Sequence, residues 1–187
     1  MRRFTVAEYH RIGEAGILTE DDRVELLEGW IVPKMTHGPR HDFTIDCVDE
    51  IVRGRLPKGW RIRIQSAITT VDSEPEPDLA IVRGPAIRYK KRHPGPGEIG
   101  VVMEVADASL DDDRNVKARL YARAGIPVYW ILNLVDETIE VFSDPSGPES
   151  EPSYRTQEIF RGGGEVPLTI DGDVIARIAV KDLLDLA

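Results

Sequence analysis

The sequence has one cysteine, Cys47, among its 187 residues. A lone cysteine excludes an internal disulfide and a zinc site built from several cysteines, and it agrees with a reducing compartment. We expect Cys47 to be a small buried apolar residue. The chain also lacks an apolar run of the roughly 18 to 20 residues that span a bilayer, and its start lacks the pattern of a signal peptide. These absences predict a cytoplasmic protein that has no membrane partner.

The sequence has no overall excess of basic residues. Its 24 Lys and Arg against 33 Asp and Glu give a formal net charge of −9, which counts against a generic nucleic-acid binder because phosphate contacts require local positive charge. Residues 53–63 and 83–93 are nevertheless basic. The second stretch contains Arg88, Lys90, Lys91 and Arg92. A nucleic-acid surface would be concentrated there, although such a charge run is more often a solvated face.

Length and composition fit one folded unit. Hydrophobic residues make up 41% and charged residues 30% of the chain, and domains typically contain roughly 100 to 200 residues. We therefore expect a single domain over residues 1–187. The capping-box spacing of Thr5 and Glu8 predicts a first helix that ends near Gly16. Apolar side chains at helical spacing predict a second helix over residues 39–56, with Phe43 and Cys47 on its apolar face.

The strands are predicted from short apolar or alternating runs. Residues 23–27 and 30–35 flank Glu28-Gly29 and predict a hairpin. Alternation over residues 61–66 predicts a half-buried strand that continues to about residue 70. Further strands are expected at residues 78–82, 99–106, 128–132 and 138–142.

Two expected helices and a loop complete the predicted order of elements. A helix should run from Asp111 to Ala124, with its acidic start suited to the helix dipole. Residues 84–97 read as a long loop, and a short helix is expected over residues 180–186. The order of elements predicts an α/β fold of the α+β kind, with a mixed sheet flanked by helices.

Two carboxylates stand at or inside the predicted central strands. Glu104 lies in the middle of an apolar strand, and Asp78 opens another directly after Pro77. Burying an ionised carboxylate without a partner is unfavourable by several kcal/mol, so solvent exposure or pairing with arginine explains either residue taken alone. Side by side, the two would repel unless a cation neutralised them, and oxygen ligands suit Mg²⁺. Such a site can hydrolyse phosphodiesters.

Several segments resemble the Uma-type family of putative restriction endonucleases, which belongs to the PD-(D/E)XK nuclease superfamily. The resemblance spans roughly residues 4–143 and is carried by residues 23–29, 77–78, 102–105, 113–117 and 121–130. It implies a restriction-endonuclease-like core in which Asp78 and Glu104 bind Mg²⁺ or Mn²⁺. It also implies that Glu25 is an additional acidic residue of the catalytic site.

The sequence departs from the superfamily's simplest pattern at one position. The residue two places after Glu104, where that pattern has lysine, is Ala106. The resemblance supplies Lys117 from the following helix, and a long flexible side chain can carry its ammonium group to the same point. Taken alone, a helical lysine would be interpreted as solvated. His41 and Gln65 are candidate neighbours of the site, although a helix-start histidine and a packed glutamine are equally good explanations.

The first hypothesis is thus a Mg²⁺-dependent endonuclease that acts on DNA, with catalytic Asp78, Glu104, Lys117 and Glu25. A homodimer is expected because a duplex has two strands to cut and symmetric dimers are common. One alternative is a nuclease-like scaffold with reduced catalysis that acts as a binding module. Another is a metal-dependent hydrolase of small phosphorylated compounds.

Overall fold

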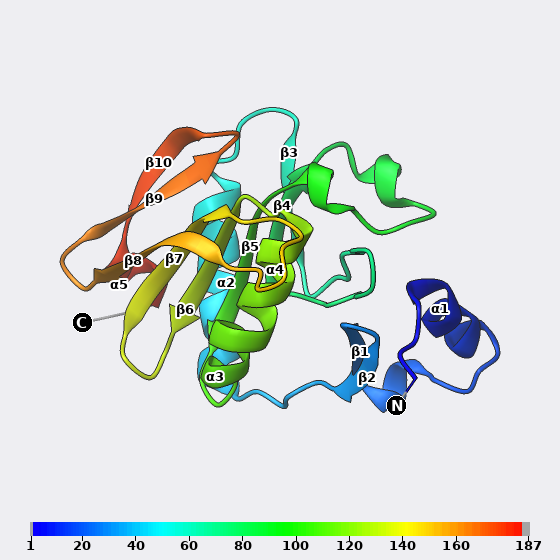
Figure 1. Ribbon diagram of the computed structural model, residues 1–187. Helices are drawn as coiled ribbons and strands as arrows, with labels where there is room; N and C mark the ends of the chain where they lie inside the picture. Colours follow the sequence, from blue (N-terminus) through cyan, green and yellow to red (C-terminus); the bar gives the residue numbers. More distant parts are fainter. Residues whose placement is uncertain (1, 185–187) are drawn as a thin grey trace.

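The protein is built around a six-stranded sheet in a computed structural model that describes residues 2–184 (Figure 1). Its strands are Trp60–Ile64 (β3), Leu79–Arg83 (β4), Ile99–Ala106 (β5), Val128–Asn133 (β6), Thr138–Pro145 (β7) and Tyr154–Arg161 (β8). They lie in the order β3-β4-β5-β6-β7-β8. β5 and β6 are parallel, and the other neighbouring strands are antiparallel. This arrangement confirms the expected mixed sheet flanked by helices.

Side-chain alternation along the central strands separates the core into two layers. In β5, Met103 and Val105 pack with apolar residues of helix α2 (Pro39–Arg53), on one face of the sheet. Val102 and Ala106 pack with residues of helix α4 (Ala118–Ala124), on the other face (Figure 1). The same alternation assigns Glu104 to the α4 face, although all of β5 is buried.

The C-terminal elements complete the layer on the α2 face. The hairpin of β9 (Glu165–Ile170) and β10 (Asp173–Ala179) leads directly into α5 (Val180–Leu184), and all three contribute side chains to the cluster that contains α2. The expected last helix is therefore present as far as residue 184, and the remainder of its predicted range lies outside the described residues. Within residues 2–184, no helix has the length and apolar character required to cross a membrane.

The N-terminal elements match their predicted types. α1 (Val6–Glu14) begins with a complete capping box between Thr5 and Glu8. β1 (Val24–Leu27) and β2 (Trp30–Pro33) form an antiparallel hairpin through Glu28 and Gly29, both at positive φ. A Cβ atom on Gly29 would lie 2.6 Å from Cβ of Arg3, so the turn needs a glycine for space as well as for conformation.

Some local expectations are wrong. The strand expected to continue to residue 70 ends at Ile64, because Gln65 takes a left-handed conformation with φ of 40° that breaks the extended backbone. Phe43 is 49% exposed and Cys47 is only partly buried, since the buried stripe of α2 runs instead through His41, Ile45 and Val48.

The predicted loop over residues 84–97 is not wholly irregular. Its beginning contains the 3₁₀ turn η2 (Ala86–Tyr89), and a second turn, η3 (Pro96–Glu98), overlaps its end. In Figure 1 this segment projects from the sheet on the side that also carries the β1–β2 hairpin.

Candidate active site

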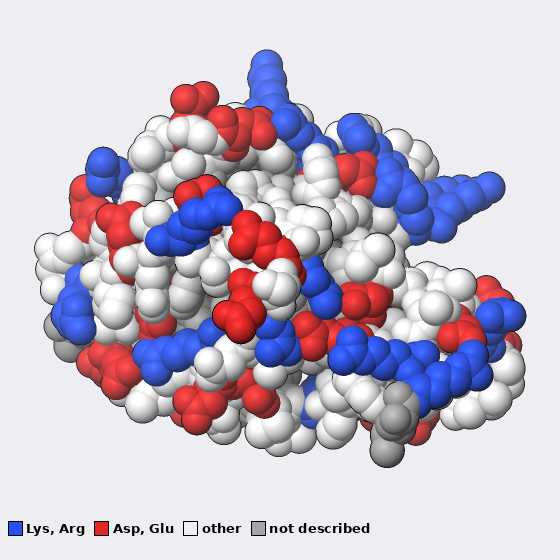
Figure 2. Space-filling model, in the orientation of Figure 1, with Lys and Arg blue, Asp and Glu red and all other residues white. Residues whose placement is uncertain are grey.

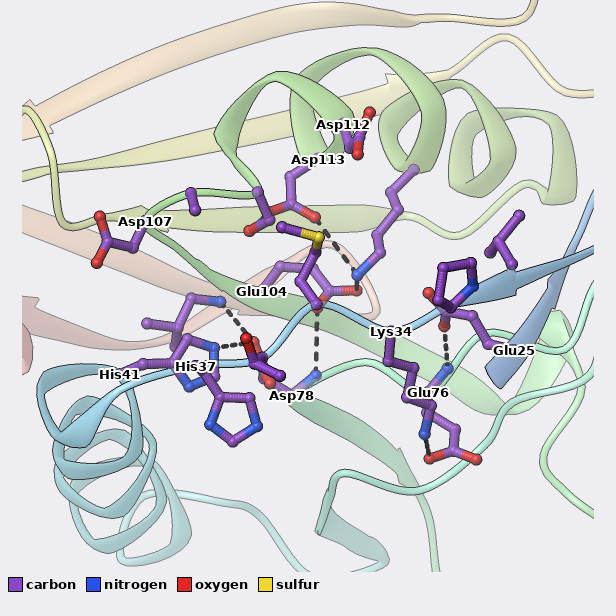
Figure 3. A pocket seen from close by; sticks show the side chains of 18 of the residues that line it. Glu25, Lys34, His37, His41, Glu76, Asp78, Glu104, Asp107, Asp112 and Asp113 are labelled. Carbon is purple, nitrogen blue, oxygen red and sulfur yellow. Dashed lines mark hydrogen bonds and ion pairs between the residues drawn. The ribbon is translucent and has the colours of Figure 1, made fainter. Parts of the chain in front are cut away.

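A pocket of about 670 Å³ lies between the β1–β2 hairpin, the start of α2 and the helical segment that follows β5. Six residues that were predicted from the sequence as site residues or their neighbours line it: Glu25, His41, Gln65, Asp78, Glu104 and Lys117. Figure 3 shows the labelled carboxylates and histidines of this wall converging from separate elements. The fold therefore assembles residues that are widely separated in the sequence around one cavity.

Asp78 is held in place from two sides as the chain enters β4. Its Oδ2 accepts a hydrogen bond from the backbone N–H of Val105 at 2.9 Å and lies 3.1 Å from Nε2 of His41. Burial by itself raises the pKa of Asp78, but His41 and the Val105 N–H more than offset that effect, so its pKa lies below the usual value. Asp78 is therefore ionised at neutral pH.

Glu104 projects from β5 into the α4 face and is 2% exposed. Its Oε1 accepts a hydrogen bond from the Tyr121 hydroxyl at 2.7 Å, and its Oε2 accepts one from the Asp78 backbone N–H at 3.3 Å. Burial raises the pKa of Glu104 to about 8; the charge of Lys117 opposes this rise, whereas the neighbouring carboxylates of Asp78, Asp113 and Glu25 add to it. Burial and the surrounding carboxylates thus favour the protonated form of Glu104 over its charged form.

Lys117 reaches Glu104 from an interrupted helix. The helix expected from Asp111 to Ala124 is divided into α3 (Leu110–Asp112), the π-helical turn η4 (Asp113–Lys117) and α4. A π turn adds a residue to the helical turn and so changes the direction of the following side chains; such turns are frequent at functional sites. Nζ of Lys117 lies 3.0 Å from Oε1 of Glu104 and 3.4 Å from Oδ1 of Asp113.

The electrostatic surroundings keep Lys117 protonated. Burial by itself lowers the pKa of Lys117, but the negative charges of Glu104, Asp113 and Glu25 more than offset that effect and raise it. The side chain is 16% exposed. A permanent cation therefore stands at the wall of the pocket.

Sequence reasoning did not single out Asp113 or Tyr121. Asp113 was interpreted as part of the acidic helix start and of a segment that carries the family resemblance, with no role of its own. It is 1% exposed, and its Oδ2 accepts a hydrogen bond from Ser109 Oγ at 2.7 Å. The signal in the sequence was its position four residues before Lys117, which places the two side chains on one helix face. Tyr121 follows Lys117 by four residues and could have been found in the same way.

Glu25 and Gln65 lie at the edges of the same pocket. Glu25 is 6% exposed on β1, and its Oε2 accepts a hydrogen bond from the backbone N–H of Glu76 at 3.0 Å. Glu76 in turn pairs with Lys34, the residue that follows β2. Gln65 is exposed at the end of β3. The carboxylate of Glu25 is thus held in position, whereas no hydrogen bond to the Gln65 side chain is found among the described residues.

The basic stretch lies outside the pocket lining. Arg88 lies 3.0 Å from Oε1 of Glu98, and Arg92 contacts both carboxylate oxygens of Glu98 at 2.5 and 2.7 Å. Lys90 and Lys91 are exposed, and neither forms an ion pair within the described part of the chain. Figure 2 shows Lys and Arg side chains gathered over the projecting segment. Arg88 and Arg92, two of the four residues expected to contact nucleic acid, are therefore already paired with a carboxylate.

Comparison with known proteins identifies the relatives of this chain. The family model of Uma2, described as "Putative restriction endonuclease", matches residues 6–176. A solved structure, described as a putative nuclease belonging to DUF820 from Anabaena variabilis ATCC 29413, superposes with a TM-score of 0.69. The two chains are 17% identical, and the match covers 93% of this chain and 97% of the other, which shows a shared fold. No match is found among curated proteins.

Proposed function

The chain belongs to the Uma2 family, and from this premise we propose that it is a metal-dependent endonuclease that hydrolyses phosphodiester bonds in DNA. The observation that carries the proposal is the convergence of Asp78, Glu104 and Lys117 at one pocket, with Lys117 Nζ 3.0 Å from Glu104. Two carboxylates and a lysine are the groups that the superfamily's catalytic pattern requires. Here the lysine comes from a helix and not from the strand that carries Glu104.

The residues of the pocket fit a hard divalent cation. Burial and the neighbouring carboxylates raise the pKa of Glu104, and a divalent cation beside it would favour its ionised form. Asp78 uses Oδ2 for both of its described hydrogen bonds, which leaves Oδ1 for another ligand. Asp78 and Glu104 would hold Mg²⁺ or Mn²⁺, with Glu25 as a further carboxylate nearby. When bound, such an ion lowers the pKa of a bound water and stabilises charge on the phosphate.

The remaining groups position these three side chains. Tyr121 donates a hydrogen bond to Glu104 and fixes its carboxylate against the α4 face. His41 and the Val105 N–H orient Asp78. Asp113 lies within 3.4 Å of Lys117, so the lysine is held at the pocket wall, where its ammonium group can bind a phosphate oxygen and stabilise developing negative charge.

One observation favours a second candidate, hydrolysis of small phosphorylated compounds. Because Glu98 binds Arg88 and Arg92, the proposed DNA surface depends mainly on Lys90 and Lys91. A small substrate would need no extended basic surface. Under the DNA proposal, a homodimer would present two such pockets, one to each strand, with each copy folded as a single domain.

Cleavage assays test the proposal directly. Purified protein is incubated with supercoiled DNA, single-stranded DNA and bis(p-nitrophenyl) phosphate, with Mg²⁺ or Mn²⁺ and with a chelator. We expect metal-dependent nicking that is lost in Asp78→Ala and Lys117→Ala and retained in Lys181→Ala, an exposed lysine of α5. Absence of nicking with both metals, or nicking that survives in both site variants, would contradict the proposal. Turnover of the small diester without nicking would favour the second candidate.

A further inference from the structure

Two histidines and an aspartate gather where the chain enters α2, beside the carboxylate–lysine cluster. Ligand atoms of His37, His41 and Asp42 all lie within 4.8 Å of one another. Nδ1 of His37 is 2.6 Å and Nδ1 of His41 is 3.6 Å from Oδ1 of Asp42. Figure 3 shows both histidine rings on the side of Asp78 away from Lys34. None of the roles proposed for the pocket uses His37 or Asp42.

His41 has a buried nitrogen that forms no hydrogen bond, because the nearest carboxylate, that of Asp42, lies 3.6 Å away. The residue is 8% exposed, and its Nε2 is occupied by Asp78. Its Nδ1 is buried and has no hydrogen-bond partner among the described residues. An unsatisfied buried polar atom is unfavourable and calls for an explanation, such as an ion that the atom binds.

The arrangement around His41 matches the way that proteins prepare a histidine for a metal ion. A ligating histidine usually donates the N–H of its other ring nitrogen to a carboxylate, which fixes the ring and leaves the free nitrogen basic. Asp78 supplies that carboxylate at 3.1 Å from Nε2, so the lone pair is left on Nδ1. The nearest carboxylate oxygen on that side belongs to Asp42.

We propose that His37, His41 and Asp42 form a binding site for a borderline divalent ion of the Zn²⁺ class. Two imidazoles and one carboxylate suit Zn²⁺, which accepts three protein ligands and keeps a fourth position open. Mg²⁺ prefers oxygen ligands, so it would remain at the carboxylate cluster. The site requires neither Glu104 nor Lys117, and its existence does not depend on the proposed nuclease activity.

Binding requires one side chain to move. The rings of His37 and His41 are stacked, with centroids 4.4 Å apart and planes at 18°, so their in-plane lone pairs cannot meet at one ion. The His37 side chain is 29% exposed and precedes α2, so its ring can turn out of the stack while His41 stays in place. The helix N-terminus disfavours a cation, and the charges of Asp42 and Asp78 offset this effect.

Metal titration of the purified full-length chain tests this site. After treatment with a chelator, Zn²⁺ alone is added and followed by calorimetry, and Co²⁺ is followed by its visible absorption. We expect one Zn²⁺ per chain in the wild type, in Glu104→Gln and in the control His93→Ala. In His37→Ala and Asp42→Asn, the affinity for Zn²⁺ should fall at least about tenfold and the tetrahedral Co²⁺ bands should disappear. Both side chains are partly or largely exposed, so neither substitution disturbs the core.

Three outcomes would overturn the proposal. They are no Zn²⁺ binding by the wild type, unchanged binding in both His37→Ala and Asp42→Asn, and loss of binding in Glu104→Gln, which would assign the ion to the carboxylate cluster. Circular dichroism of His37→Ala and Asp42→Asn checks that the fold is retained. Because Glu104→Gln removes a proposed catalytic ligand and leaves this site intact, failure of the nuclease proposal and failure of the Zn²⁺ proposal give different results.

Discussion

The ammonium nitrogen of Lys117 lies 3.0 Å from Oε1 of Glu104, although one residue belongs to a π-helical turn and the other to the buried strand β5. Ala106, two residues after Glu104 on that strand, faces the same side of the sheet but carries no charge. The helix that covers this face therefore supplies the positive group. The π turn is what directs Lys117 and Asp113 toward the sheet, and it makes the geometry of the pocket depend on contacts between the helix and β5.

Tyr121→Phe tests the hydrogen bond that anchors Glu104. Removing the hydroxyl leaves Oε1 with Lys117 alone, and we expect a loss of about 1 to 2 kcal/mol of unfolding free energy together with slower DNA nicking. Tyr154→Phe is the matched control, because this partly buried tyrosine donates to the Ile126 carbonyl at 2.9 Å and does not contact Glu104. It should lose similar stability in urea unfolding but nick at the wild-type rate. Equal nicking by the two variants would contradict a positioning role for Tyr121.

Glu104→Gln tests the divalent-ion site through stability. Because the folded-state pKa of Glu104 is raised to about 8, ionising this carboxyl opposes folding as the pH rises from about 4.5 toward 8. In chelator at pH 7 the variant should therefore be at least as stable as the wild type. Mg²⁺ should raise the melting temperature of the wild type and not that of the variant, since an ion stabilises only the state that binds it.

Glu140→Gln provides the contrast for that experiment. Glu140 is 1% exposed on β7, but its carboxylate is paired with Arg114 at 2.5 Å and accepts hydrogen bonds from Asn133 and Gln157. Breaking these charged hydrogen bonds should destabilise the protein by about 1.5 to 3 kcal/mol in chelator while leaving the Mg²⁺ response intact. If Mg²⁺ stabilised Glu104→Gln as much as it stabilises Glu140→Gln, Glu104 would not be a ligand.

Glu98 should contribute to stability in a pH-dependent way. Hydrogen bonds from Arg92, the Gly95 N–H and Arg88 outweigh the opposing effect of burial and lower the pKa of Glu98 from 4.5 to about 2. A lowered folded-state pKa means that the contribution is present above pH 4.5 and is lost as the pH falls toward 2. Its size is limited to about 1 kcal/mol, because the two arginines are largely exposed.

Urea unfolding between pH 6 and pH 2.5 measures this contribution. Glu98→Gln should be less stable than the wild type at pH 6, and the difference should shrink as the pH falls. Glu158→Gln, an exposed glutamate on β8 with no ion pair among the described residues, should match the wild type throughout. A difference for Glu98→Gln that stays constant down to pH 2.5 would show that the ion pair is not its source.

The engagement of Arg88 and Arg92 by Glu98 predicts unequal roles in DNA binding. Exposed Lys90 and Lys91 have no carboxylate partner in the described part of the chain, so their removal should weaken binding and reduce the magnitude of the salt slope by up to about 2. Replacing both Arg88 and Arg92 should change the salt slope less, because Glu98 already partly neutralises these two charges in the wild type. Fluorescence anisotropy at several salt concentrations makes the comparison. Equal slopes for both double variants would contradict this ranking.

The fold was predicted mainly from the order and apolar pattern of the expected strands. The apolar runs at β4, β5 and β6 correctly indicated central strands, and alternation along β5 is enough to put Glu104 and Ala106 on one face. The N-terminal capping box and the Glu28-Gly29 turn were also correct, because both depend on interactions within a few residues of one another. The end of β3 was missed, since the left-handed conformation of Gln65 is not apparent from its side chain.

By itself, the sequence determined the elements whose energy is local: helices with their caps, strands with their alternation, and the two carboxylates that stand at or inside buried strands. Only the tertiary structure decided how those groups combine. It showed that Lys117 turns inward through a π turn, that Asp113 is buried beside it, and that Glu98 neutralises two of the four expected DNA contacts. It also left Nδ1 of His41 without a hydrogen bond among the described residues. The physical reason is that burial and charge pairing depend on distances between segments far apart in the chain, which residue spacing along the sequence does not contain.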